Sequence, residues 1–90
     1  MKRITKNDLI KLKILVLLEK SHDKFSTTAI SKKLGTKHET AHNSIAFLTL
    51  CGLLELSTEK HGSLVYEYVQ LSDLGRKVAG GINHAVFNRA

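Results

Sequence analysis

The segment His38-Glu39-Thr40-Ala41-His42 matches the pattern H-E-x-x-H. In zinc proteases the two histidines of this pattern lie one helical turn apart and bind the metal, and the glutamate acts as general base. A zinc protease also needs a third ligand, and the extended pattern places a glycine and then a histidine after the second histidine. Ile45 and Leu48 occupy those two positions here. We therefore do not expect the chain to be an enzyme.

Other roles for His38 and His42 stay open at this point. The pair could bind a metal without catalysis, it could face solvent, or at least one histidine could contact DNA. The motif is weak without a third ligand, and Glu39 has a structural explanation given below. The sequence favours DNA contact, so we predict neither a metal nor another cofactor.

A helix predicted over residues 37–51 must position this segment. Gly35 ends the helix before it, and Gly52 is expected to cap its C-terminal end. Thr36-x-x-Glu39 matches a capping box, in which the threonine hydroxyl accepts a hydrogen bond from a free amide and the glutamate reaches back. Glu39 is thus explained by the start of the helix.

The same helix has an apolar stripe and an opposite polar face. Ala41, Ile45 and Leu48 recur at helical spacing and should face the core, whereas Asn43 lies on the far side. Cys51 is expected to be a small buried residue near the helix end. An intersubunit disulfide or a redox switch at Cys51 are the alternatives.

A first helix is predicted over residues 7–20, with Thr5 or Asn7 as N-cap. Residues 14–18 are all apolar. Five consecutive positions cover every side of a helix, which a helix with one buried face would not need. We therefore predict two apolar partners for this helix: the core, and either a second subunit, which we favour, or the last helix of the same chain.

A short helix is predicted from residue 27 to Gly35, capped by Ser26 or Thr27. Residues 54–69 then resemble a β-hairpin with a turn at 60–62, because β-branched and aromatic residues alternate there. A last helix begins after Ser72 and carries an apolar stripe. Gly80-Gly81 either breaks this helix or allows another helix to approach closely.

Composition and charge limit the class of protein. Ninety residues form one domain, 1–90, and no apolar run is long enough to span a membrane. A single cysteine fits a reducing compartment, so we expect an intracellular, cytoplasmic protein. The net charge is +6, and ten of the 14 Lys and Arg residues lie in the first 37 positions. This asymmetry favours a nucleic-acid partner.

The order of helix, short helix, helix, hairpin and helix is that of a winged helix-turn-helix in the α+β class. The segment TTAISKKLGTKHETAHNSIAFLTLCGLLE resembles the core of winged-helix regulators of the MarR/ArsR kind, and LSDLGRK at 71–77 resembles the segment that follows their wing. In size the chain is most similar to small archaeal or viral regulators. The resemblance implies sequence-directed binding of double-stranded DNA by a homodimeric transcriptional regulator. A winged helix that binds proteins inside a larger assembly is the alternative.

In this family the helix from Lys37 would enter the major groove and the wing would lie along the backbone. Asn43 can pair with adenine, Thr40 can contact a base, and lysines and free helix-start amides can hold phosphates. A homodimer would cover apolar stripes of the first helix and of the C-terminal helix, 73–90. The predicted DNA-binding residues are Thr27, Lys32, Lys33, Thr36, Lys37, His38, Thr40, His42, Asn43, Lys60 and His61, and the predicted dimer residues are Leu15, Val16, Val78, Ile82 and Val86.

Overall fold

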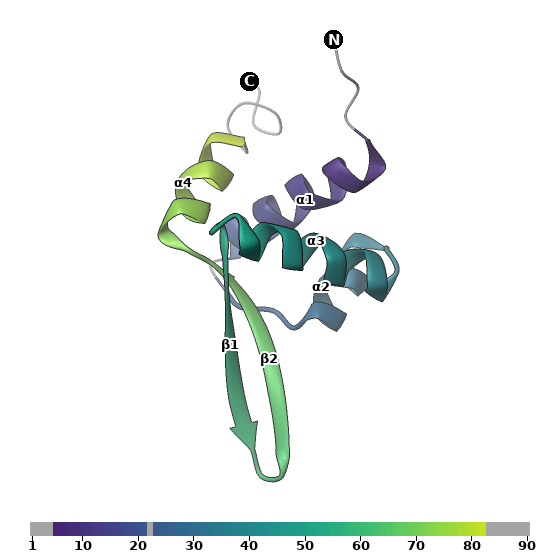
Figure 1. Cartoon of the computed structure of the whole chain (residues 1–90), viewed down its shortest axis with the longest axis vertical. Coiled ribbons are helices and arrows are strands. Elements are labelled where there is room, and N and C mark those ends of the chain that lie inside the picture. Colours follow the sequence, from purple (N-terminus) through teal and green to yellow (C-terminus); the bar gives the residue numbers. More distant parts are fainter. Residues whose placement is uncertain (1–4, 22, 83–90) are drawn as a thin grey trace.

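The structure is a computed structural model that describes residues 5–21 and 23–82. The helices lie together at one end, and a long hairpin projects from them (Figure 1). This order of elements is the one predicted from the sequence. The elements are α1 (Lys6–Ser21), α2 (Thr27–Leu34), α3 (His38–Leu50), β1 (Leu54–His61), β2 (Leu64–Leu71) and α4 (Asp73–Ile82).

Side-chain caps start three of the helices. The Thr5 hydroxyl accepts a hydrogen bond from the amide of Asp8 at 3.1 Å, which confirms Thr5 as a cap of α1. The Ser26 hydroxyl accepts one from the amide of Ala29 at 3.1 Å and so caps α2. Ser72 caps α4, as predicted, since the amide of Gly75 donates to its hydroxyl at 3.0 Å.

Both predicted glycine stops are confirmed. Gly35 has φ 65° at the end of α2, and Gly52 has φ 79° just after α3. After α3 the amide of Leu53 donates to the carbonyl of Leu48, and that of Gly52 donates to Thr49. This is the pair of hydrogen bonds in a Schellman motif, for which a left-handed residue is needed.

The core is assembled around α1, which packs against all three other helices and β2. Of residues 14–18, all but Leu17 are buried. The chain itself therefore covers nearly the whole apolar band. α4 packs on α1, which is the alternative to a second subunit, so no second subunit is needed to cover residues 14–18. The other buried apolar residues are Ile30, Ala41, Ile45, Leu48, Leu54, Val69, Leu71 and Ala79.

The hairpin is antiparallel, and its register pairs Leu54 with Leu71 at the base and His61 with Leu64 at the tip. Gly62 has φ 67° in the turn, as expected of a tight hairpin. A third segment joins its base, because the amide and carbonyl of Phe25 both bond to Val69, at 3.1 and 2.8 Å. The base of the hairpin is thus fixed to the segment that leads into α2.

The first turn of α4 lies against the turn after α3. The Ser72 hydroxyl donates to the carbonyl of Gly52 at 2.6 Å, and the Ser72 amide donates to the carbonyl of Leu53 at 3.1 Å. Gly75 lies directly over that carbonyl. By contrast, α4 runs through Gly80-Gly81 without a break, so the predicted break does not occur, and no atom of the described residues lies within 4 Å of a Cβ built at either glycine.

Candidate nucleic-acid interface

The H-E-x-x-H segment occupies the first turns of α3, and its two histidines are exposed. The rings of His38 and His42 lie parallel with centroids 6.5 Å apart. The positions at which a zinc protease would continue its pattern hold Ile45 and Leu48, each 3% exposed in the core. Across residues 5–21 and 23–82 no group of three potential metal ligands occurs. The segment therefore presents two imidazoles on a helix surface.

The predicted capping box was wrong. α3 begins at His38 with Lys37 as N-cap, and no side chain caps it. The amide of Thr36 donates to the carbonyl of Ser31 at 3.0 Å, so Thr36 still completes the end of α2. The amide of Thr36 itself is therefore occupied, whereas no side chain caps the first turn of α3, where free amides were predicted to hold a phosphate. Glu39 is exposed near the start of α3.

Buried and exposed residues of α3 separate cleanly. Ala41, Ser44, Ile45 and Leu48 face the core, as the predicted stripe requires, with Ser44 added to it. His42 and Asn43 are exposed, and Thr40 is half-buried. The N-terminal half of the helix therefore shows polar side chains to solvent, with Lys37 just before it.

α2 brings two lysines next to the start of α3. Lys32 and Lys33 lie in its last turn, and both are exposed. The ammonium of Lys33 lies 5.6 Å from the ring centre of Phe25, which holds it at the surface. Thr27, the first residue of α2, is half-buried. Lys32 and Lys33 are thus open to solvent, and the phosphate contacts predicted for them stay a prediction.

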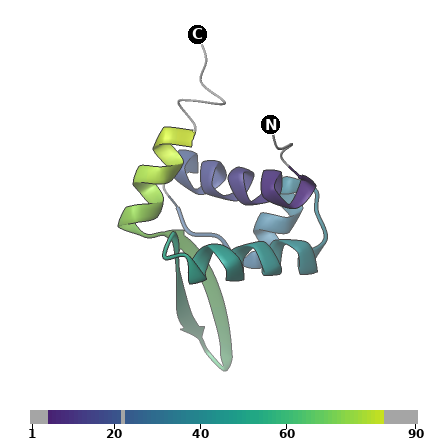
Figure 2. The ribbon, with the colours of Figure 1, turned by 45° about the horizontal axis from the view of Figure 1, so that its top comes forward.

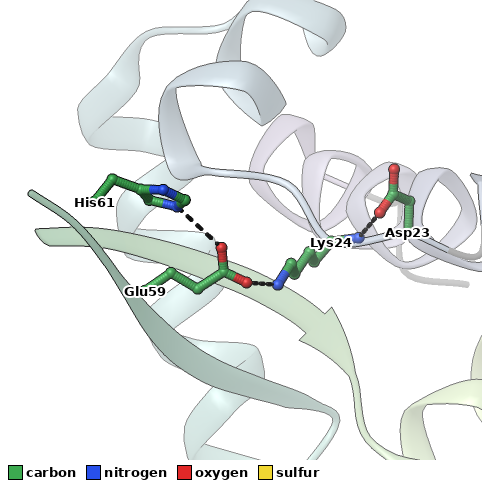
Figure 3. A network of polar contacts seen from close by, with 4 residues as sticks. All are labelled: Asp23, Lys24, Glu59 and His61. Atoms are coloured by element: carbon green, nitrogen blue, oxygen red, sulfur yellow. Dashed lines mark hydrogen bonds and ion pairs between the residues drawn. The ribbon is translucent and has the colours of Figure 1, made fainter.

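The hairpin carries the remaining candidates. Lys60 is exposed, and no carboxylate among the described residues lies within ion-pair distance of it. His61 is engaged, since its Nε2 lies 3.3 Å from Glu59 Oε2 and its ring meets Tyr66 edge-on at 5.3 Å. Figure 3 shows that Glu59 also pairs with Lys24, which comes from the segment before α2. Lys24 lies 5.0 Å from the ring centre of Tyr68 as well.

This network ties the hairpin to the helix-turn-helix. Lys24 precedes Phe25, whose backbone bonds to the base of the hairpin. The Lys24 side chain pairs with Glu59, nearer the tip of the hairpin. The Lys24 amide also bonds to Asp23 Oδ1 at 2.8 Å. Sequence reasoning missed this contact, because nothing local relates residue 24 to residue 59.

The predicted dimer residues fall into three groups. Leu15 and Val16 are 2% and 8% exposed and are buried by the chain's own elements, so they are not free to form an interface. Val78 and Ile82 on α4 are half-buried against the core. Val86 lies outside the described residues.

Cys51 is exposed, so the prediction that it is buried was wrong. It directly follows Leu50, the last residue of α3, which is itself 87% exposed. A hollow of about 300 Å³ between α1 and α3 was not predicted; the sequence signal was the i, i+4 pair Asn7 and Lys11 on α1. The hollow is lined by Asn7, Lys11, Thr40, Asn43, Ser44 and Phe47.

None of the helices that the structure describes is long and apolar enough to cross a bilayer.

No protein-family model and no curated protein matches the chain. Solved structures do match. A protein from Streptococcus mutans superposes with a TM-score of 0.78 at 22% identity, over 98% of this chain and 87% of that one. A transcriptional regulator homologue from Pyrococcus horikoshii gives 0.75 at 18% identity, over 90% and 79%.

The chain is an α+β winged helix. The order of elements and the superpositions together confirm the fold that the MarR/ArsR-like residues implied. The adhesin competence repressor of Streptococcus pyogenes shares this fold with a TM-score of 0.72 at 21% identity, over 96% of this winged helix. The winged helix spans 60% of the length of that repressor and 55% of the length of the regulator BldR from Sulfolobus solfataricus.

Proposed function

We propose that this winged helix binds double-stranded DNA and regulates transcription as a homodimer in the cytoplasm. The observation that carries the proposal is the placement of exposed polar residues at the start of α3, with the lysines of α2 and the hairpin. Exposed lysines next to a polar helix face are the surface that phosphates and base edges require. Several proteins of similar fold are named transcriptional regulators, which supports the same reading. No enzymatic activity is part of the proposal.

In the proposed complex the first turns of α3 lie in the major groove. Asn43 reads adenine through its amide, and His42 and Thr40 contact neighbouring base edges. Lys32, Lys33 and Lys37 bind phosphates on one side of the groove. His38 and Thr27 complete this side, while Lys60 and His61 bring the wing to the backbone.

Binding of a duplex with random sequence, followed by fluorescence anisotropy, tests the proposal. We expect binding at low salt and a steep, linear fall of log affinity with log salt concentration, because lysine contacts release counterions from the DNA. Selection of bound sequences from a random pool then tests for direct readout. Absence of binding at low salt would remove the proposal.

The homodimer is proposed to form through α4. Leu74, at the start of α4, is 53% exposed, and Val78 and Ile82 are only partly covered by α1. A two-fold axis beside α4 would bury these side chains twice and could set the two α3 helices about 34 Å apart, one turn of DNA. The length of the chain, which is similar to that of small archaeal or viral regulators, is consistent with such a small dimer.

Sedimentation equilibrium tests the dimer independently of DNA. We expect a dimer for the unchanged chain and a monomer for Leu74→Glu with Val78→Glu, because a buried carboxylate in an interface is strongly unfavourable. A selected DNA consensus with two-fold symmetry would support the same arrangement. A monomer at all concentrations, together with a non-palindromic consensus, would contradict it.

A further inference from the structure

A second feature of the surface lies along α1, on the side of α3 away from the hairpin. Figure 2 shows α1 and α3 side by side, with the hairpin projecting from the opposite side of α3. A hollow of about 300 Å³ lies between α1 and α3, and a second of about 480 Å³ lies between α1 and the turn from α2 to α3. Both are lined by Asn7 and Thr40. The two hollows adjoin at these shared residues, and we name them together the α1–α3 groove.

The groove combines an apolar floor with a basic rim. Its larger hollow is lined by Leu9, Ile10 and Leu34, and Leu9 is 36% exposed. At the far end Phe47 is 51% exposed. The rim is formed by the exposed lysines Lys6, Lys13 and Lys37.

The positive charge on this rim is not neutralised by neighbouring carboxylates. No acidic side chain lines either hollow in the described part of the chain. Asp8 lies nearby but pairs with Lys11 at 3.6 Å. A hydrogen bond with the Thr5 side chain, together with the charge of Lys11, lowers the pKa of Asp8, so the Asp8 carboxyl is ionised at neutral pH. Lys6, Lys13 and Lys37 have no such partner among the described residues.

We propose that the α1–α3 groove is a docking site for an acidic amphipathic helix of another protein. Apolar side chains of that helix would cover Leu9, Ile10 and Leu34, and its carboxylates would pair with the lysine rim. Lys6 and Lys13 are seven residues apart, which on α1 is about 10 Å. Carboxylates two turns apart on an incoming helix have the same spacing.

Other occupants fit the groove less well. Phosphates of DNA would use the lysines but would leave the apolar floor uncovered, whereas an amphipathic helix uses both. A second copy of this chain related by a two-fold axis would bring the same lysines of both copies together, and like charges repel. Charge complementarity together with the apolar floor therefore favours an acidic protein segment.

The site would be coupled to the proposed DNA interface, and this part rests on the proposed function. Lys37 and Thr40 line the groove and are also predicted DNA contacts. A helix bound in the groove would cover both residues. Occupation of the groove is therefore expected to weaken DNA binding.

A labelled synthetic peptide tests the site. The probe is a helix of about 14 residues, four turns, with leucines three and four positions apart and flanking glutamates. We expect binding at low salt, with amide shifts in the NMR spectrum confined to α1, the α2–α3 turn and the groove side of α3. We expect Lys13→Glu to weaken binding about tenfold. The matched control, Lys20→Glu, changes an exposed lysine of the same helix outside the groove and should cost less than about twofold.

Each alternative has its own outcome. A peptide with glutamines in place of the glutamates should bind weakly to the unchanged chain. The docking site would be overturned by equal losses of peptide affinity in Lys13→Glu and Lys20→Glu, by amide shifts on the hairpin, or by absence of peptide binding. If Lys13→Glu weakened duplex binding as much as it weakened peptide binding, the lysines would be assigned to DNA. That result would also overturn the docking site. If the unchanged chain binds no duplex, the proposed function fails while the peptide experiment still decides the docking site.

Discussion

Replacement of Gly75 by alanine is predicted to destabilise the fold strongly. The new Cβ would lie well inside van der Waals contact of the Leu53 carbonyl oxygen, 2.9 Å from its carbonyl carbon and 3.2 Å from Leu71 Cδ2. The obstacle is backbone that already accepts the hydrogen bond from Ser72. No rotamer change relieves it, so α4 would have to move as a unit.

The magnitude follows from this geometry. Overpacking a core costs about 1–3 kcal/mol when side chains can adjust, and here a backbone must shift, so we expect at least about 3 kcal/mol. For a domain of this size that loss lowers the midpoint of thermal unfolding by more than about 12 °C. Gly80→Ala is the matched control in the same helix, because no atom of the described residues lies within 4 Å of a Cβ there. It should raise the free energy of unfolding by about 0.5–1 kcal/mol through helix propensity.

Thermal and urea unfolding of the two variants, followed by circular dichroism, measure both effects. The two variants are expected to change the free energy of unfolding in opposite directions. The new Cβ would overlap backbone at position 75, whereas at position 80 it contacts none of the described residues. Equal stability of Gly75→Ala and the unchanged chain would refute the close packing of α4 on the turn after α3. A loss for Gly80→Ala as large as for Gly75→Ala would show that alanine is disfavoured in α4 for another reason.

Four further predictions concern the surface. Lys24→Ala and Glu59→Ala should each destabilise the fold modestly and show a coupling of about 0.5 kcal/mol in a double-mutant cycle of urea unfolding, because the pair is partly exposed; additive losses would contradict the contact. Lys60→Ala should reduce the salt slope of duplex binding by about one without changing sequence preference, and an unchanged slope would place the wing off the DNA. Asn43→Ala should cost about 1–3 kcal/mol at one base position in selected sites, whereas a uniform loss would make Asn43 a backbone contact. Cys51 should react fully with Ellman's reagent in the folded protein, and protection until unfolding would contradict its exposure.

Helix boundaries were predictable where the signal is local. Thr5, Ser26 and Ser72 each accept a hydrogen bond from an amide three residues on, so the residue type and its position suffice. Gly35 and Gly52 were predictable for the same reason, because left-handed backbone favours glycine. The capping box was wrong although it is a local pattern, because α2 and α3 are too close for Thr36 to end one helix and cap the other. The Thr36 amide bonds to the carbonyl of Ser31 at the end of α2.

Features that depend on distant residues were not predictable. Residues 14–18 looked too apolar for one domain because the sequence does not show how many elements surround α1. The link between Lys24 and Glu59 joins residues 35 positions apart. Likewise the basic character of α1 was visible, but its apolar groove against α3 follows from packing. The polar face of α3 was predicted because it needs only the helical period.

Duplex binding as a function of salt tests directly whether this winged helix binds DNA. A random duplex of about 20 base pairs, one turn per half-site, is titrated with the full chain at several salt concentrations. We expect binding at low salt and a slope of log affinity against log salt equal to several phosphate contacts, reduced by about one in Lys60→Ala. No binding at low salt, or an affinity independent of salt, would contradict DNA binding by this winged helix.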